Sequence, residues 1–265
     1  MKQLIFNADD FGYSRGANLA ILDCHRLGIL TSATIMAGMP GFEHAVEIAK
    51  ATPTLGVGVH LTLTAGRPVL EGHRSLILDG GEFPRLGHYK DETTVIDVDE
   101  VEREWEAQIS RVLKAGITPT HLDSHHHIHS YKGLGELFVD LAKRHDLPMR
   151  NRMECTPGLD ARGVPQPGCL VDPLSTSGVT GDMDLRTYRA IMLEGTAAQI
   201  GKMFESHDCV EVMTHPAYCD YRLMTGSSFN TPRVVEADLL MSDEMRRAIE
   251  ALGDIKLVSY RCFKQ

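Results

Sequence analysis

The feature that most constrains the fold is an alternation between short apolar runs and segments of helical periodicity, which continues along nearly the whole chain. Short apolar runs between turn residues are typical of buried strands, and apolar residues spaced three or four apart are typical of helices. Because parallel strands need a crossover connection, this alternation predicts βα units and a mainly parallel sheet. Six or seven such strands suit a (β/α) barrel or an open doubly wound sheet, and periodicity alone does not separate the two.

The expected elements follow from this pattern. We predict strands at residues 3–8, 31–36, 55–63, 120–124, 209–216 and 255–260. We predict helices at residues 14–27, 42–51, 98–115, 134–145, 184–194, 196–206 and 242–252. Two Gly/Pro-rich stretches of weak periodicity, 64–96 and 155–183, are expected to be loop insertions. One domain over residues 1–265 is expected, because a chain of this length with 43% apolar residues can form one large core.

Composition narrows the classes of partner. The net charge of −9 argues against binding to nucleic acid or to an anionic membrane, since both require a basic surface. No stretch approaches the roughly 18 to 20 apolar residues of a membrane-spanning helix, and the N-terminal apolar run is too short for a signal peptide. The six cysteines are scattered and form no CxxC pattern. We therefore expect a soluble, cytoplasmic protein with free thiols and a small substrate.

Polar residues that could bind a metal or take part in catalysis follow the predicted strands at the points where the strands end. In a barrel and in a doubly wound sheet alike, the carboxyl ends of parallel strands meet at one side of the fold, and chemistry is placed there. We therefore expect one site built from residues far apart in the chain, namely Asp9, Asp10, His60, Asp123, His125, Arg150 and His215.

The segment HLDSHHHIHS, residues 121–130, contains five of the thirteen histidines. If it is extended, alternate residues from His121 to His129, with Asp123 and His125 among them, share one face. A metal ion usually takes three or four protein ligands, so the other histidines would orient the ligands, contact substrate or have no role at the site. A solvated, His-rich turn remains the alternative, although the internal position and the interleaved aspartate speak against it.

Two imidazoles and one carboxylate, from His60, His125 and Asp10, would leave coordination positions open for water and substrate. Such a site can polarise a carbonyl and lower the pKa of bound water. In a regular strand, Asp9 and Asp10 point in opposite directions, so one can reach a metal while the other addresses a water. The alternatives are a turn for the aspartate pair and a packed core residue for His60.

His215 and Arg150 complete the candidate set. His215 in THPAY is suited to act as a general acid, with packing at the strand end as the alternative. Arg150 is suited to orient a carboxylate, with an ordinary surface ion pair as the alternative.

Four motifs carry a resemblance to a known family. NADDFG at 7–12, GVHL at 58–61, THLDSHHHIH at 120–129 and THPA at 214–217 resemble, in order and spacing, the YdjC-like carbohydrate deacetylases. The match is closest to the chitooligosaccharide deacetylases of that family and covers nearly the whole chain. The resemblance implies a distorted or incomplete TIM-type (β/α) barrel related to polysaccharide deacetylases. It also implies a homodimer that removes an N-acetyl group from short N-acetylglucosamine oligosaccharides, with or without a 6-phosphate.

Position by position, the resemblance implies that Asp10, His60 and His125 bind one divalent metal ion. It implies Asp9 as the general base and His215 as the acid that protonates the departing amine. Residues that line the sugar pocket or support the site would be His127, Arg150 and Asp123, while His121, His126 and His129 receive no role. The family is described with Mg²⁺, whereas two imidazoles suit Zn²⁺ or another transition ion better.

Two other functions remain open at this stage. A metal-dependent phosphoesterase on a similar barrel would bind two or three metal ions and would recruit several of His121, His127 and His129 as further ligands. A non-enzymatic, His-rich metal buffer would have little use for Asp9 and His215 at other strand ends.

Overall fold

The computed structural model describes residues 1–152, 159–173 and 183–264. The strands in these ranges are β1 (Lys2–Phe11), β2 (Ser32–Ile35), β3 (Gly56–Leu61), β4 (Leu122–Ser124), β5 (Cys169–Val171), β6 (Cys209–Thr214) and β7 (Ile255–Leu257). The helices before β5 are α1 (Arg15–Leu27), α2 (Phe42–Ala51), α3 (Leu86–Lys90), α4 (Val98–Lys114) and α5 (Leu134–Arg144). The later helices are α7 (Leu185–Met203), α8 (Tyr221–Gly226), α9 (Thr231–Met241) and α10 (Asp243–Glu250), and η1 (His125–Ser130) and η3 (Tyr260–Phe263) are 3₁₀ segments.

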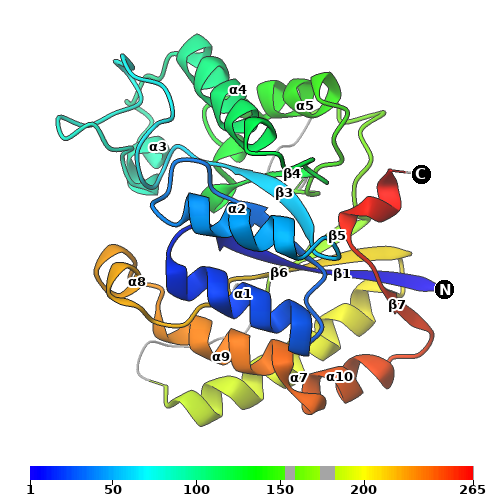
Figure 1. The fold of residues 1–265 in the computed structure, drawn as a ribbon. Helices are drawn as coiled ribbons and strands as arrows, with labels where there is room; N and C mark the ends of the chain where they lie inside the picture. The colour runs from blue at the N-terminus through cyan, green and yellow to red at the C-terminus, as the bar shows by residue number, and fades with distance from the viewer. Residues whose placement is uncertain (153–158, 174–182, 265) are drawn as a thin grey trace.

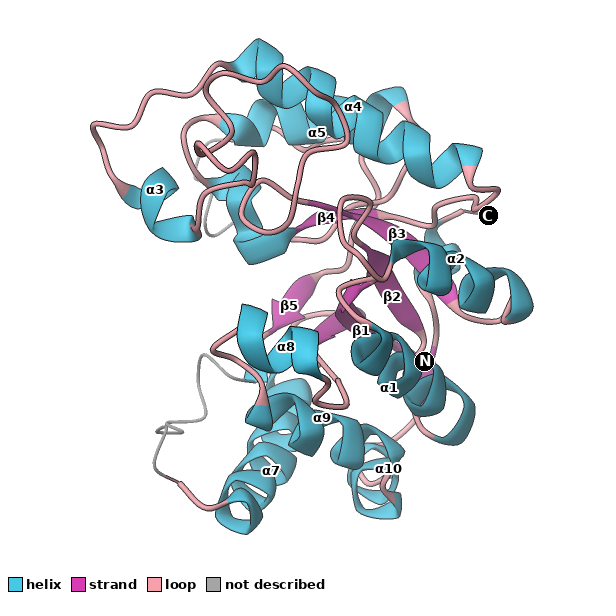
Figure 2. Cartoon of the chain, turned by 60° about the vertical axis from the view of Figure 1, so that its left-hand side comes forward, coloured by secondary structure: helices cyan, strands magenta, loops and turns pink. Residues whose placement is uncertain are grey.

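The strands form one parallel sheet in the order β4-β3-β2-β1-β6-β5, with β7 beside the first residues of β1. Between the outer strands, a single parallel bridge joins Leu122 to Met149, whose N–H donates to the carbonyl of Pro165. The sheet therefore curls into an incomplete barrel, which confirms the expected α/β, barrel-like class. Helices surround it, and both termini lie at the amino ends of the strands (Figures 1 and 2).

The central position of β1 explains its burial. All eight residues from Leu4 to Phe11 are buried, because β1 is paired on both edges and covered on both faces. Outside the sheet, Trp105 of α4 packs edge-on against Phe138 of α5 at 6.5 Å between ring centroids. Ser14 caps α1 by accepting the N–H of Ala17, as its position in the sequence predicts.

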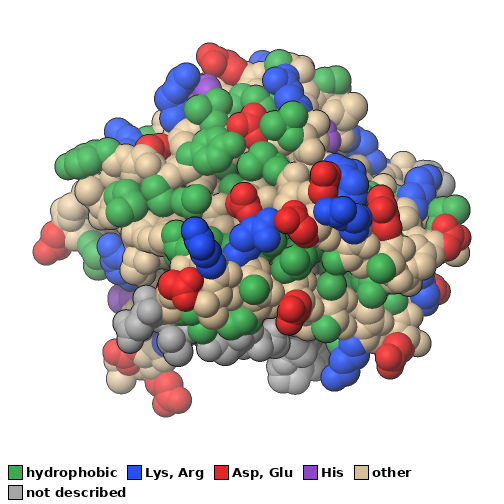
Figure 3. Space-filling model, turned by 90° about the horizontal axis from the view of Figure 1, so that it is seen from below, with side chains coloured by type: hydrophobic (Ala, Val, Ile, Leu, Met, Phe, Trp, Pro, Cys, Tyr) green, Lys and Arg blue, Asp and Glu red, His purple; other side chains and the backbone are tan. Residues whose placement is uncertain are grey.

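The outer surface carries charges of both signs. On the face seen from below, Lys and Arg side chains are interspersed with Asp and Glu among hydrophobic side chains, rather than gathered into a basic patch (Figure 3). Among the described residues, every helix is too short or too polar to span a lipid bilayer.

Several sequence-based expectations differ from the structure. The two helices expected at 184–194 and 196–206 are the single helix α7, because Gly195 inside a helix costs only about 1 kcal/mol and does not end it. The stretch 155–183, expected to be a loop, contains β5, and the rest of it lies partly outside the described residues. Helices α8 and α9, between 221 and 241, had not been predicted.

The first insertion is held to α4 by two buried carboxylates. Glu100 accepts the backbone N–H groups of Arg74 and Ser75, and Glu104 accepts those of Val69 and Leu70. These bonds satisfy backbone donors that a loop of this length would otherwise expose to water. The insertion carries α3, which lies beyond the carboxyl ends of the strands on the same side as α8 (Figure 2).

Candidate functional site

Asp9 and Asp10 lie where β1 departs from regular strand geometry. The pairing register of β1 with β2 shifts between Ala8 and Phe11, and Asp10 has a φ of 66°. Both carboxylates consequently approach the same imidazole: Oδ2 of Asp9 lies 4.0 Å and Oδ1 of Asp10 lies 3.5 Å from Nε2 of His60. The expectation that the two side chains diverge is valid for a regular strand and is wrong at this bulge.

His60, near the end of β3, is oriented by the neighbouring strand. Its Nδ1 lies 2.5 Å from Oδ1 of Asp123, and the hydroxyl of Thr34 donates to Oδ2 of the same carboxylate at 3.0 Å. Burial alone would lower the pKa of His60, but Asp123 and Asp9 outweigh it and raise this pKa to about 9. The carboxylate–imidazole pair leaves Nε2 facing Asp10, an arrangement that is common behind metal-binding histidines.

A three-residue group with the chemistry of a metal site forms around Asp10. Nδ1 of His125 lies 3.1 Å from Oδ1 of Asp10, and the candidate ligand atoms of Asp10, His60 and His125 all lie within 4.8 Å of one another. Nε2 of His60 and Oδ1 of Asp10 are buried without a hydrogen-bond partner in the described part of the chain. Two imidazoles, one carboxylate and these unsatisfied atoms together fit a divalent ion.

A second group of candidate ligands meets the same distance criterion but is already engaged. It consists of Asp9, His60 and Asp123. The guanidinium of Arg150 donates to both oxygens of Asp9 and lies 3.0 Å from Oδ2 of Asp123. This neutralising contact makes the group around Asp10 the better candidate.

Arg150 is fully buried, so the alternative of a surface ion pair is wrong. Its backbone is fixed beside β4, since its N–H donates to the carbonyl of Leu122. Its side chain also donates to Glu211, which accepts the hydroxyl of Tyr260 at 2.5 Å. Burial would raise the pKa of Asp9, but the adjacent guanidinium outweighs it and holds this pKa well below its usual range.

His215, at the end of β6, completes the arrangement around Asp9. Its Nε2 lies 3.9 Å from Oδ2 of Asp9, and its backbone N–H donates to the carboxylate of Glu236. The ring meets the edge of Phe229 at 5.7 Å between centroids. Burial lowers the pKa of His215 despite the neighbouring Asp9 carboxylate, so the ring is neutral near pH 7.

The His-rich segment does not continue β4. The strand ends at Ser124, and left-handed backbone at His126 and His127, with φ of 55° and 50°, turns η1 away from the strand direction. The segment is therefore not extended, so the condition under which His121, Asp123, His125, His127 and His129 would share one face is not met. Positive φ is costly for these residues and is not visible in a hydrophobicity pattern.

The remaining histidines of the segment divide into core and cavity residues. His121 stacks on Tyr260 at 3.6 Å and bonds the amide oxygen of Asn7, and a Cβ at Gly58 would lie 2.5 Å from its ring. His129 stacks on Phe138 at 4.3 Å. His126, whose ring lies beside that of His125, and His127 both line a cavity of about 490 Å³. Asp9, Asp10 and His215 line the same cavity.

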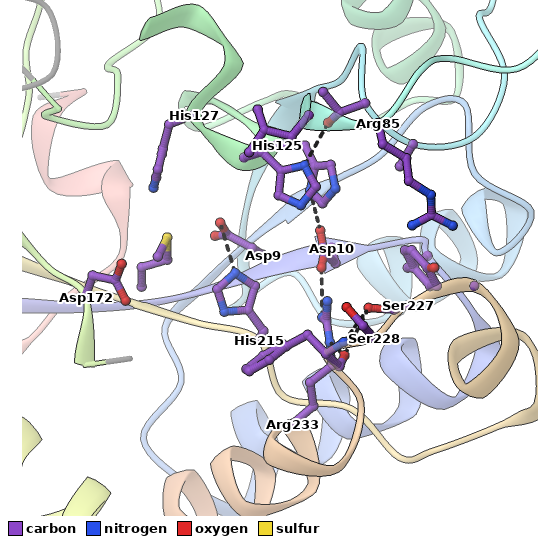
Figure 4. A pocket seen from close by; sticks show the side chains of 18 of the residues that line it. Asp9, Asp10, Arg85, His125, His127, Asp172, His215, Ser227, Ser228 and Arg233 are labelled. Carbon is purple, nitrogen blue, oxygen red and sulfur yellow. Dashed lines mark hydrogen bonds and ion pairs between the residues drawn. The ribbon is translucent and has the colours of Figure 1, made fainter. Parts of the chain in front are cut away.

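Sequence reasoning missed part of the cavity wall. Arg233, from α9, places Nη1 2.7 Å from Oδ2 of Asp10 (Figure 4). Arg85 and Asp172 reach the cavity from the two insertions. A cavity of about 590 Å³ adjoins the first one and shares part of its wall, including Tyr13, Thr64 and Arg85. An N-cap signal at Asn230 with Pro232 after it would have revealed α9.

Comparisons with known proteins give a consistent picture. The model of a family described as YdjC-like protein matches residues 3–251. A carbohydrate deacetylase of Brevibacillus brevis is 39% identical over 258 residues, which are 97% of this chain and 98% of that protein. A crystal structure from Enterococcus faecalis V583, of a protein named for a proposed role in cellobiose-phosphate cleavage, has a TM-score of 0.82 at 32% identity and covers 98% of both chains.

A more distant likeness concerns the fold alone. The Xyl-CE4 domain of a multidomain xylanase, from the hindgut metagenome of Trinervitermes trinervoides, has a TM-score of 0.51 at 11% identity. The match covers 97% of this chain and 87% of that one.

Proposed function

The chain belongs to the YdjC-like protein family, and from this premise we propose that it is a metal-dependent deacetylase of short N-acetylglucosamine oligosaccharides. One observation carries the proposal. Asp10 and His125 line one cavity together with Asp9 and His215, and His60 lies behind them within reach of the same ion, although these residues come from four separate strand ends. The name of the Brevibacillus brevis relative supports the reaction type and the carbohydrate substrate.

We assign the metal to Asp10, His60 and His125. When bound, a divalent ion there supplies a Lewis acid that lowers the pKa of water and polarises an amide carbonyl. The family resemblance favours Mg²⁺, while the two imidazoles favour Zn²⁺ or another transition ion. Asp123 fixes the tautomer and the angle of His60, and Arg150 holds Asp9 ionised at neutral pH.

In the proposed hydrolysis, Asp9 takes a proton from the water whose oxygen attacks the acetyl carbonyl carbon. The C–N bond then breaks, and His215 delivers a proton to the departing nitrogen, so the products are acetate and the free amine. Because burial keeps the resting ring of His215 neutral, it has to gain a proton before it can donate one. Asp9, 3.9 Å away, is the neighbouring group able to pass on the proton that it takes from water.

The cavity supports a substrate longer than one sugar. Two adjoining spaces of about 490 and 590 Å³ share a wall, and each is in the range of ordinary ligand pockets. We propose chitobiose- or chitotriose-type substrates, with or without a 6-phosphate, with His127 among the residues that contact the sugar. The family resemblance supports a homodimer, and the free thiols of the described cysteines support a cytoplasmic location.

The test is acetate release from N-acetylglucosamine, its dimer and trimer, and their 6-phosphates, each with Mg²⁺ and with Zn²⁺. We expect release from at least one oligosaccharide and nearly none from the Asp9→Asn variant purified in the same way. If the wild-type protein releases acetate from none of these sugars with either ion, the proposed substrate class is wrong.

A further inference from the structure

The two carboxylate oxygens of Asp10 face different partners. Oδ1 lies toward the imidazoles, 3.1 Å from Nδ1 of His125 and 3.5 Å from Nε2 of His60. Oδ2 lies on the opposite side, 2.7 Å from Nη1 of Arg233. Figure 4 shows Asp10 between His125 and Arg233, with dashed contacts in both directions.

Arg233 is itself held in place. Its side chain is almost fully buried, its Nε donates to the carbonyl of Phe229 at 2.7 Å, and its guanidinium lies 5.2 Å from the centroid of the Phe229 ring. The backbone is also tied down, because the carbonyl of Arg233 accepts the N–H of Ala217, two residues after His215. A guanidinium fixed at Nε and over a ring presents its Nη atoms in one direction.

Asp10 needs such a partner because its backbone does not restrain it in the ordinary way. It has the left-handed φ of 66°, and the strand register breaks around it. A carboxylate with no fixed contact can rotate and offer either one or two oxygens to an ion. With Oδ2 engaged by Arg233, only Oδ1 remains directed toward His60 and His125.

We propose that Arg233 is a positioning residue that makes Asp10 a one-oxygen metal ligand, so that coordination positions stay open for water and substrate. This inference rests on the proposed function in one respect, because it takes Asp10 as a ligand of the metal. It adds a residue from α9, outside the four motifs, to the machinery of the site. A structural role for Arg233 in joining α9 to β1 would not depend on how Asp10 binds an ion.

The decisive variant is Arg233→Lys, which keeps the positive charge but loses the planar fork and its Nε donor. Affinities for Zn²⁺ and Co²⁺ are measured on the metal-free protein by competition with a chromogenic chelator, and the visible spectrum of the Co²⁺ form reports coordination geometry. We expect about tenfold weaker binding, as for other residues that orient metal ligands, together with an altered Co²⁺ spectrum. Because no substrate is involved, this result stands even if the protein releases no acetate from any sugar tested.

Arg189→Gln is the matched control. Arg189, on α7, pairs with Asp238 of the same helix α9, and both side chains are partly exposed and lie outside the cavity lining. This variant loses an Arg–carboxylate contact to α9 and is expected to bind both ions like the wild type. If it weakened binding as much as Arg233→Lys does, general loosening of α9 would be the cause and the proposal would fail.

A second variant covers the case in which Arg233→Lys does not fold. In Arg233→Ala, low-millimolar guanidinium ion is expected to restore metal affinity and the wild-type Co²⁺ spectrum, while the same concentration of sodium ion does not. Wild-type affinity and an unchanged Co²⁺ spectrum in Arg233→Lys, or an Arg233→Ala variant that guanidinium leaves unrestored, would overturn the assignment.

Discussion

Both carboxylate oxygens of Asp9 are held by the guanidinium of Arg150, with 2.8 Å between Nη1 and Oδ2 and 2.6 Å between Nη2 and Oδ1. The two residues are 141 positions apart in the chain, and both are buried. A bidentate contact of this kind fixes the plane of the carboxylate and keeps it ionised. It also makes Asp9 a weak base, so its proposed role in taking a proton depends on a water molecule that is unusually acidic.

The first prediction concerns Asp9 itself. Asp9→Asn is expected to keep the metal and to lose turnover by a factor of about 10² to 10⁴, the usual contribution of a general base. His125→Ala is the comparison and is expected to lose both the metal and turnover. Metal content per chain and the rate of acetate release measure the two effects. Full turnover by Asp9→Asn would show that another group accepts the proton.

The second prediction concerns the stability that Arg150 provides. Arg150→Met leaves Asp9, Asp123 and Glu211 buried together without their shared cation, and it should lower the free energy of unfolding by about 3–5 kcal/mol. Arg144→Met is the matched control, since Arg144 also contacts three carboxylates but is partly exposed. Its cost is expected to stay under about 1 kcal/mol in urea titrations. Equal losses in the two variants would contradict this role of burial.

The convergence of the site residues could be predicted from the sequence because it follows from topology. Once β1, β3, β4 and β6 are parallel strands of one sheet, the residues after them must meet at one side of the sheet. No long-range packing information is needed for that step. This is why Asp9, Asp10, His60, His125 and His215 could be brought together from strand ends alone.

The parts that could not be predicted depend on contacts between distant segments or on unusual backbone. The burial of Arg150 depends on the pairing of Met149 with β4. The left-handed backbone at His126 leaves no trace in the pattern of hydrophobic residues. Helix α9 has low amphipathicity, which reflects burial on several sides, so periodicity does not mark it. Arg233 was missed with it, because a lone arginine in a loop indicates nothing.

The third prediction concerns the first insertion. Glu100→Ala removes the acceptor for the N–H groups of Arg74 and Ser75, and the insertion that carries Arg85 into the cavity wall should then move more freely. We expect KM for the oligosaccharide to rise several-fold while kcat changes less than about twofold. The reason is that a mobile insertion would contact the substrate less well in the ground state and in the transition state alike. Asp99→Ala, the exposed neighbour in the same helical turn, controls for the charge at the start of α4. A fall in kcat at unchanged KM would contradict this role of the insertion.

The fourth prediction concerns the pH dependence of stability. Burial raises the pKa of Glu236 to about 7, so the folded protein holds this proton more tightly than the unfolded chain, for which the value is 4.5. The resulting stabilisation is complete below pH 4.5 and is lost as the pH rises to about 7. Glu236→Gln should remove that loss, and the difference in unfolding free energy between variant and wild type should change by roughly 3 kcal/mol between pH 4.5 and 8. Parallel stability curves over this range would show that folding does not raise the pKa of Glu236.

The fifth prediction concerns the number of metal ions, which separates a deacetylase from a phosphoesterase of similar architecture. In the described part of the chain, both groups of candidate ligands share His60, and Arg150 already occupies the one that contains Asp9 and Asp123. Of the histidines that further ions would recruit, His121 and His129 are engaged with Asn7 and Ser124, and His127 alone lines the cavity. We therefore expect one ion per chain by elemental analysis.

Removal of that ion with a chelator should abolish acetate release, and one equivalent of metal should restore it. His129→Gln is the matched control and should still bind one ion, because His129 packs on Phe138 rather than facing the cavity. Two or more ions per chain, with hydrolysis of a phosphate ester such as 4-nitrophenyl phosphate, would instead favour the phosphoesterase. That outcome would require Arg150 to leave Asp9 and Asp123, at the cost of the buried ion pairs that hold the carboxyl ends of β1 and β4 together.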